Sequence, residues 1–134
     1  MQTALCLAAK NGVDVHLITP GIPDKKAVFK VTRSYYLPLL EAGVKISIIT
    51  DAPVISERRL ALCAGIAVSE GLDYEEGWRA VTVNPACGTG IGDRVGSLEA
   101  GKDGDVVIWT ADPLTTVGAK AFVTVIDGKV VYKA

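Results

Sequence analysis

Two short apolar runs with a shared pattern organise the first half of the chain. Residues 13–18 (VDVHLI) alternate apolar and polar positions as a strand does, and residues 44–49 (VKISII) form a second run of the same kind. The segments 12–20 and 43–51 resemble each other at an offset of 31 residues, which is the length of one βαβ unit. The spacing therefore predicts two parallel neighbouring strands joined by a right-handed crossover.

Helical patterns surround the two expected strands. Four helices are expected, over residues 2–11, 24–42, 56–70 and 73–83. The last of them begins with Asp73 and Glu76, which form a capping box. The dipeptide Asn84-Pro85 is expected to end this helix, and the glycine-rich residues 87–92 are expected to be irregular.

The last third of the chain changes to short β-branched runs. Strands are expected over residues 94–98, 105–109, 122–126 and 129–132. The dipeptide Asp127-Gly128 between the last two runs is typical of a type I′ hairpin turn. We therefore expect an α/β fold with a short parallel βαβ core flanked by helices. The C-terminal strands either extend the same sheet or form a small β unit of their own.

The composition is that of one folded domain with a surplus of apolar residues. The chain has 134 residues, of which 49% are hydrophobic, and its mean hydropathy is +0.34. A single α/β domain over residues 1–134 is expected, in three segments of different character: 1–46, 47–92 and 93–134. The apolar surplus indicates a core or a subunit interface, because no apolar run approaches the ~20 residues of a membrane helix.

Charge and cysteine usage narrow the partners and the compartment. The formal net charge is −1, from 14 basic and 15 acidic residues, which gives no reason to expect nucleic acid or a membrane as a partner. The chain has three cysteines, which are far apart in the sequence: Cys6, Cys63 and Cys87. An odd number at this spacing does not indicate a disulfide framework, so we expect free thiols in a reducing cytoplasm. The N-terminal residues lack the basic and apolar regions of an export signal, so a cytoplasmic location is expected.

His16 is the only histidine, and this count limits the chemistry. A mechanism that needs two histidines within one chain is excluded. His16 lies inside the first expected strand with no acid or nucleophile pattern beside it, so we expect a structural or surface histidine. On this basis neither a catalytic residue nor a cofactor is expected.

Asp51 is the one residue whose position along the chain predicts chemistry. It closes the second expected strand, and the carboxyl ends of parallel strands carry the reactive groups of α/β folds. A carboxylate there can bind a divalent metal such as zinc, or accept a proton from water. The competing interpretation is an aspartate that caps a turn or a helix, because Pro53 and Ser56 follow it.

Three further motifs carry weaker signals. Residues 88–92 (GTGIG) follow an expected helix instead of a strand, which is atypical of a dinucleotide-binding loop. Residues 101–104 (GKDG) lack the preceding glycine and following hydroxyl residue of a phosphate loop. The second expected helix carries a basic face, which is usually solvated but can bind an anion or a phospholipid headgroup. Its residues are Lys25, Lys26, Lys30 and Arg33.

Residues 4–46 resemble the cardiolipin synthases of the phospholipase D superfamily. The resemblance is carried by GVDV, by PG-PDK and by RSYY-LLEAGVKI. In that family the next strand leads into a catalytic H-x-K-x4-D motif. Here His16 is followed by Leu17 and Ile18, so the motif is absent and the nucleophilic histidine of that family carries over to no position.

Residues 41–134 resemble the C-terminal part of metal-dependent amidohydrolases, in the imidazolonepropionase-like branch. The matching runs are AGVKISIITDAPV, LCAGIAVSEGLD, AVTVNPA, DRVGSLEAGKDGDVVIW and VIDGKVVY. The resemblance implies that Asp51 is a metal ligand or general base and that the last strands belong to a small β-sandwich. It also implies an H-x-H pair and further histidines on earlier strands, and His16 alone does not supply them.

The two resemblances overlap at residues 41–46, where a crossover keeps helix, glycine and strand in phase. Our leading hypothesis from the sequence is therefore an engineered or selected chimera, folded but without enzymatic activity. One alternative is a metal-dependent amidohydrolase in which Asp51 meets ligands from other subunits. Another is a binder of anions or phospholipid headgroups. Exposed strand edges are expected to drive self-association, as a homo-oligomer or a strand-exchanged dimer.

Overall fold

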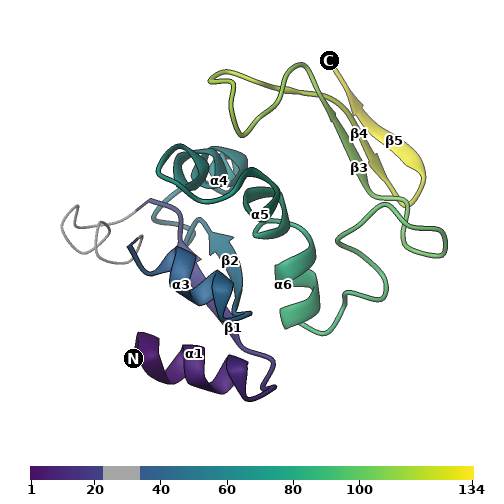
Figure 1. Cartoon of the computed structure of the whole chain (residues 1–134). Coiled ribbons are helices and arrows are strands. Elements are labelled where there is room, and N and C mark those ends of the chain that lie inside the picture. Colours follow the sequence, from purple (N-terminus) through teal and green to yellow (C-terminus); the bar gives the residue numbers. More distant parts are fainter. Residues whose placement is uncertain (23–33) are drawn as a thin grey trace.

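The computed structural model describes residues 1–22 and 34–134. Most of the second expected helix lies outside the described residues, and so do the four basic residues proposed to bind an anion or a headgroup. Helices and strands follow one another along the chain in Figure 1. The first elements are α1 (Gln2–Lys10), β1 (His16–Pro20), α3 (Tyr36–Glu41), β2 (Lys45–Ile49), the 3-10 turn η1 (Glu57–Arg59) and α4 (Leu60–Ser69). They are followed by α5 (Tyr74–Arg79), α6 (Val83–Gly88), β3 (Val106–Trp109), β4 (Ala121–Ile126) and β5 (Lys129–Lys133).

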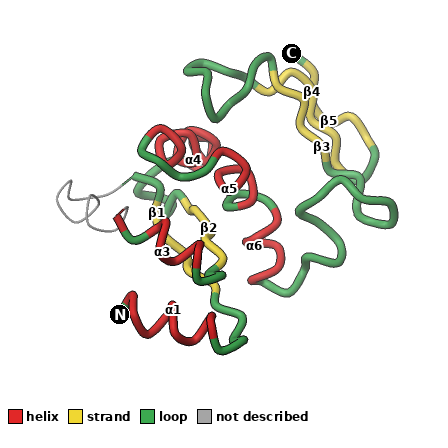
Figure 2. Tube along the Cα trace, in the orientation of Figure 1, coloured by secondary structure: helices red, strands yellow, loops and turns green. Residues whose placement is uncertain are grey.

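The two expected strands of the first half pair as predicted. β1 and β2 are parallel, with His16 opposite Lys45 and Pro20 opposite Ile49. The structure agrees with the expected α/β class, because it combines helices with strands. The strands form one parallel pair and one antiparallel sheet. The two sheets, whose strands are all drawn in yellow, are separate in Figure 2.

Helices α3 to α6 and α1 supply the cover that a parallel pair needs. One cluster of buried side chains joins β2 to α4 and to the turn that precedes α5, through Ile46, Ile48, Cys63 and Leu72. A smaller cluster joins α1, α3 and the ends of the two strands, and its buried members are Val15, Leu39 and Val44. The core therefore lies between the parallel pair and the helices that cover it.

Within the described residues no helix is long and apolar enough to cross a membrane.

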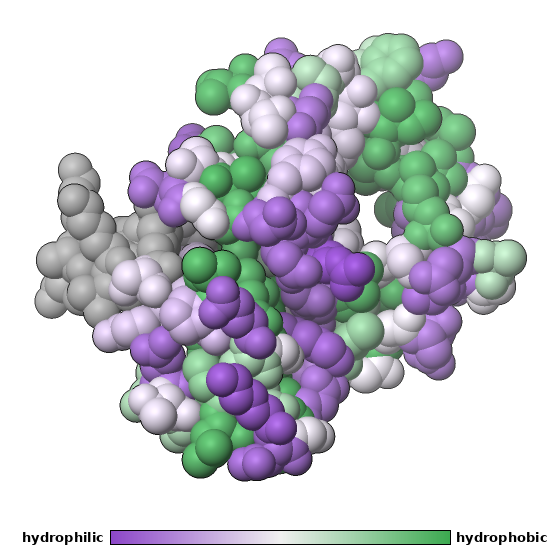
Figure 3. Space-filling view, in the orientation of Figure 1, coloured by the Kyte–Doolittle hydropathy of each residue, from purple (hydrophilic) through white to green (hydrophobic). Residues whose placement is uncertain are grey.

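The C-terminal strands form their own sheet and do not extend the parallel pair. β3, β4 and β5 are antiparallel in the order β3-β4-β5, and β4 and β5 form the hairpin expected around Asp127-Gly128. Asp127 and Gly128 both have positive φ, at 50° and 71°, as a type I′ turn requires. This sheet lies apart from the helices in Figure 1. Much of its apolar surface is exposed and appears as a green area in Figure 3, where a hollow separates it from the helical part.

The prediction of a strand over residues 94–98 was wrong. This stretch is part of a loop, because the Lys102 ammonium lies inside it and donates to the Gly92 carbonyl and to Ser97 Oγ, each at 2.7 Å. Arg94 and Asp103 close the base of the same loop with an ion pair of 2.6 Å. Side-chain bonds of this kind bend the backbone away from a sheet ladder.

The expected end of a helix at Asn84-Pro85 was also wrong, because a helix begins there. Helix α6 runs from Val83 to Gly88, so Pro85 lies in its first turn, where a missing N–H group costs no intrahelical bond. The Thr89 hydroxyl donates to the Pro85 carbonyl at 2.8 Å and lies 3.3 Å from the Ala86 carbonyl. These contacts end the helix. The prediction that residues 87–92 are irregular was therefore wrong for Cys87 and Gly88, which lie in the last turn of α6.

Candidate functional site

Asp51 lies at the carboxyl end of β2, as its place in the sequence predicts. Its backbone is left-handed, with φ of 54°, and its side chain is exposed. A residue other than glycine in this conformation carries a strain of about 1–2 kcal/mol, which is less for aspartate than for a branched side chain. Such strain persists where the surrounding fold imposes it, and functional sites are frequent among these positions.

The capping interpretation of Asp51 finds no hydrogen bond to support it. The local turn is closed by the backbone, where the Val54 N–H donates to the Asp51 carbonyl at 2.9 Å. Ser56, at the start of η1, makes no side-chain cap bond. Within residues 1–22 and 34–134 the Asp51 carboxylate has no hydrogen-bond or ion-pair partner, so it is available to a substrate, water or metal.

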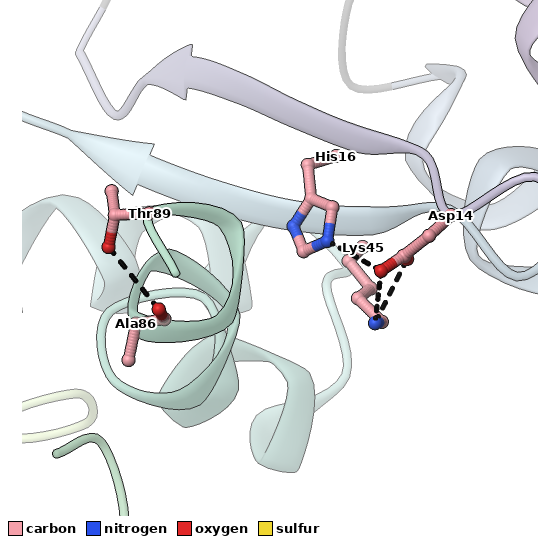
Figure 4. Close-up of polar contacts among 5 residues, drawn as sticks. All are labelled: Asp14, His16, Lys45, Ala86 and Thr89. Carbon is pink, nitrogen blue, oxygen red and sulfur yellow. Dashed lines mark hydrogen bonds and ion pairs between the residues drawn. The ribbon is translucent and has the colours of Figure 1, made fainter. Parts of the chain in front are cut away.

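His16 lies at the opposite end of the sheet, at the start of β1. Its Nε2 is 3.2 Å from Asp14 Oδ2, and Lys45 Nζ contacts both oxygens of the same carboxylate at 2.9 and 3.1 Å (Figure 4). The hydrogen bond from Lys45, followed by the one with His16, lowers the pKa of Asp14 below its usual 3.8. This cluster ties the entry of β1 to the entry of β2.

The other ring nitrogen of His16 faces helix α6. His16 Nδ1 is buried and has no hydrogen-bond partner in the described part of the chain. A Cβ added to Gly88 would lie 2.9 Å from this nitrogen, so only glycine lets α6 approach the ring so closely. His16 thus packs against α6. The structure differs from the sequence-based expectation in giving its ring an acidic neighbour, Asp14, and in leaving Nδ1 without a partner among the described residues.

His16 and Asp51 are not brought together. Lys45, which is opposite His16, and Asp51 are six residues apart along β2 and its extension. At ~3.3 Å per residue the two ends are about 20 Å apart. Among the residues that the structure describes, no group of three or more histidine, cysteine, aspartate or glutamate side chains is placed to hold a metal ion.

Two polar contacts, which involve three polar side chains, were not identified from the sequence. Asn84 is 5% exposed, and its side-chain amide donates to the Ile46 carbonyl of β2 at 2.8 Å. Nothing in its local sequence predicts this contact, because the partner is 38 residues away. The Asp14–Lys45 pair did have a signal. The two residues occupy equivalent positions of the two similar segments, 31 residues apart, and carry opposite charges.

The chain belongs to the amidohydrolase family, because the model of that family matches residues 4–133. An amidohydrolase from Thermotoga maritima superposes with a TM-score of 0.82 at 30% identity, over 99% of this chain and 35% of that chain. A zinc-bound adenosine deaminase from Xanthomonas campestris shares the fold at a TM-score of 0.64 and 23% identity. The amidohydrolase tasK from Hapsidospora irregularis is 37% identical over 90 residues, which are 67% of this chain and 9% of that protein. The chain thus spans about a third of the length of these solved structures, and its match covers about a tenth of the length of the curated relative.

The resemblance to cardiolipin synthases is a short local match. The enzyme from Geobacillus thermodenitrificans is 61% identical over 44 residues, which are 33% of this chain and 9% of that protein. The amidohydrolase model extends across the N-terminal segment as well, and nothing in the comparisons requires two ancestors. The hypothesis of a chimeric scaffold without enzymatic activity was therefore wrong, and the amidohydrolase alternative fits the findings better.

Proposed function

We propose that this protein takes part in the hydrolysis of a C–N bond of an amide-like substrate, with Asp51 as the reacting carboxylate. The observation that carries the proposal is the placement of Asp51 in a chain of the amidohydrolase family. Asp51 is exposed at the carboxyl end of a parallel strand, in a strained backbone conformation and without a side-chain partner among the described residues.

An exposed carboxylate at this position can act as a general base. Asp51 takes a proton from a water molecule as the water oxygen bonds to the substrate carbonyl carbon. The C–N bond then breaks, and the same proton passes to the leaving nitrogen. The products are a carboxylic acid and an amine or ammonia, so atoms and charges balance.

The described residues of one chain do not fit a complete metal centre. A catalytic zinc takes about three protein ligands, whereas Asp51 is a single carboxylate and His16 lies at the far end of the sheet. A metal bound at Asp51 therefore needs ligands from beyond the described residues, and we derive no step through a metal. Zinc is the metal to test, because the adenosine deaminase neighbour binds it.

The test compares the wild type with Asp51→Asn, which removes the negative charge at constant shape. Both are assayed for release of amine or ammonia from a panel of linear and cyclic amides, with and without added zinc, and the bound zinc is measured by mass spectrometry. We expect hydrolysis by the wild type and its loss in the variant. Asp14→Asn, at the other end of the sheet, is the matched control and should keep its activity. A wild type that hydrolyses none of the panel, or an Asp51→Asn variant that is equally active, overturns the proposal.

A further inference from the structure

Gly21, the first residue after β1, lies where three elements meet. It is buried, and its N–H donates to the Ile49 carbonyl at 3.0 Å, which joins the end of β1 to the end of β2. A Cβ added to Gly21 would overlap the Cys63 Cβ of α4 and would lie 3.0 Å from the Ile48 Cγ2 of β2. Gly21 is not among the glycines with positive φ. The lack of space, and not the backbone conformation, therefore requires glycine here.

The loop that carries Asp51 depends on Gly21 at both of its ends. This loop, residues 50–56, begins directly after Ile49, whose carbonyl is held by the Gly21 N–H. It ends where η1 leads into α4, and α4 packs on Gly21 through Cys63, which is 0% exposed. Ile55, near the end of the loop, packs against the same buried cluster as Cys63. The spacing between the strand ends and α4 therefore sets the path of the loop.

The backbone of Asp51 needs support of this kind. Its φ of 54° is unfavourable for a residue other than glycine and persists only where the surrounding structure imposes it. The hydrogen bond from the Val54 N–H to the Asp51 carbonyl closes the turn, but both of its partners lie within the loop. The Ala80 carbonyl accepts from the Ile48 N–H at 2.9 Å and holds β2, but it does not contact α4. Gly21 is the residue that relates β1, β2 and α4 at this end of the sheet.

We propose that Gly21 is a positioning residue for Asp51. By letting α4 pack directly on the strand ends, it holds the Asp51 loop in the conformation that directs the carboxylate toward a reacting water molecule. The kinetic part of this inference rests on the proposed hydrolytic function, whereas the structural part concerns the Asp51 backbone alone. A methyl group on Gly21 must displace Cys63 by about 1 Å, because non-bonded carbons lie about 3.5–4.0 Å apart. A misplacement of this size can lower a catalytic rate about 100-fold.

The first test is Gly21→Ala, with two measurements. For an amide that the wild type hydrolyses, kcat should fall about 100-fold while KM stays nearly constant, because Gly21 acts on the geometry of Asp51 and not on substrate binding. The NMR chemical shifts of Asp51 and its coupling between the amide and Hα protons report its φ without any substrate. In the variant they should move away from the values of a left-handed residue.

Gly65→Ala is the matched control, because it adds the same methyl group to the same helix. There the methyl group meets the Leu114 backbone, in the connection between β3 and β4, and not the end of the parallel pair. The control should lose stability but keep kcat and the Asp51 signals close to those of the wild type. It therefore separates the positioning of Asp51 from a general loosening of α4.

The double variant Gly21→Ala/Cys63→Gly moves the methyl group from one side of the contact to the other. It deletes the Cβ that the new methyl group would overlap. Compared with Gly21→Ala, it should regain about tenfold or more in kcat, since the two changes act on one contact, and its Asp51 signals should return toward the wild type. Circular dichroism verifies folding. If Gly21→Ala alone does not fold, the double variant decides, and altered Asp51 signals in the folded double variant overturn the proposal.

The two proposals can fail separately. A wild type that hydrolyses no amide removes the proposed function, and the NMR comparison still decides whether Gly21 fixes the Asp51 backbone. Unchanged Asp51 signals in folded Gly21→Ala overturn the positioning role, and so does an unchanged kcat in an enzyme that Asp51→Asn inactivates. The role is also overturned if Gly65→Ala lowers kcat as much as Gly21→Ala does.

Discussion

The side-chain amide of Asn84 donates to the backbone carbonyl of Ile46 at 2.8 Å, and both residues are buried. The bond anchors the first turn of α6 to the middle of β2, 38 residues earlier in the chain. It also gives a hydrogen bond to the Ile46 carbonyl, which would otherwise be buried without a partner. Removing either partner therefore leaves a buried polar group without a bond.

Asn84→Ala is expected to reduce the free energy of unfolding by about 1–3 kcal/mol, because the Ile46 carbonyl keeps its desolvation cost and loses its donor. Urea denaturation followed by circular dichroism measures the change. Asn84→Asp is the sharper companion variant, since it keeps the shape of the side chain but presents an oxygen to the carbonyl. It should cost at least as much as the alanine variant. A loss below ~0.5 kcal/mol in both variants would show that water replaces the bond.

Gly65 in α4 is expected to reject a methyl group. A Cβ added there would overlap the Leu114 carbonyl, which belongs to the backbone and cannot rotate away. Leu114 is 6% exposed and is the one residue after α6 that joins the main buried cluster. Gly65→Ala should therefore lower the free energy of unfolding by about 1–3 kcal/mol, although alanine is the better helix former.

Leu62→Ala serves as the control for Gly65→Ala, because Leu62 is on the same helix and 38% exposed. It should cost less than Leu114→Ala, which removes a buried side chain and is expected to cost about 2–5 kcal/mol. Gly65→Ala and Leu114→Ala should also be non-additive, because the added methyl group displaces the Leu114 backbone and with it the buried side chain that Leu114→Ala removes. Additive losses would mean that the added methyl group is accommodated without moving Leu114.

Asp14 is expected to make stability depend on acidity. Its pKa is lowered from the usual 3.8 by the hydrogen bond from Lys45 and then by that with His16, so the folded protein binds fewer protons than the unfolded chain near this pH. The contribution is present above pH 3.8 and is lost as the pH falls through the lower, folded-state pKa. Urea denaturation at a series of pH values, from pH 6 downwards until the protein unfolds, measures this contribution to the free energy of unfolding.

Two variants isolate the Asp14 contribution. Asp14→Asn should show a shallower loss of stability in acid than the wild type, and Lys45→Met should do the same, because it removes the largest cause of the lowered pKa. Lys45→Met should have the smaller effect, because the hydrogen bond with His16 still lowers the pKa of Asp14. A wild-type slope that Asp14→Asn leaves unchanged would assign the acid sensitivity to other carboxylates.

The parallel pair was predictable because its signal is local and repeated. The segments 12–20 and 43–51 alternate in the same way and are one βαβ unit apart, and this alone predicts two parallel neighbours. The hairpin at Asp127-Gly128 was predictable for a similar reason, since the turn needs residues that tolerate positive φ. The sequence pattern was misleading where the local structure depends on other parts of the fold. Lys102 keeps residues 94–98 out of a sheet, and the first turn of α6 accepts Pro85.

The candidate site was predictable in position and not in geometry. The place of Asp51 after a strand predicts the reactive end of the sheet, but its left-handed backbone and its lack of a side-chain partner in the described part of the chain depend on the fold. The count of one histidine led to the wrong conclusion that no enzymatic role remains. That count limits one chain, whereas the family match concerns a fold of which this chain spans about a third.

Asp51→Asn separates a functional carboxylate from a capping one by its effect on stability. Asparagine adopts the left-handed conformation as readily as aspartate, so a residue without side-chain bonds should be replaced at a cost below ~0.5 kcal/mol. Asp51→Gly should be similarly mild, because glycine relieves the strain at a φ of 54° while it adds disorder to the unfolded chain. Asp51→Val should cost about 1–2 kcal/mol more, since a branched side chain is poorly tolerated there. Urea denaturation ranks the three variants. Hydrolysis lost in Asp51→Asn at unchanged stability is the result that the general-base role requires, whereas a loss above ~1 kcal/mol in that variant would restore the capping interpretation.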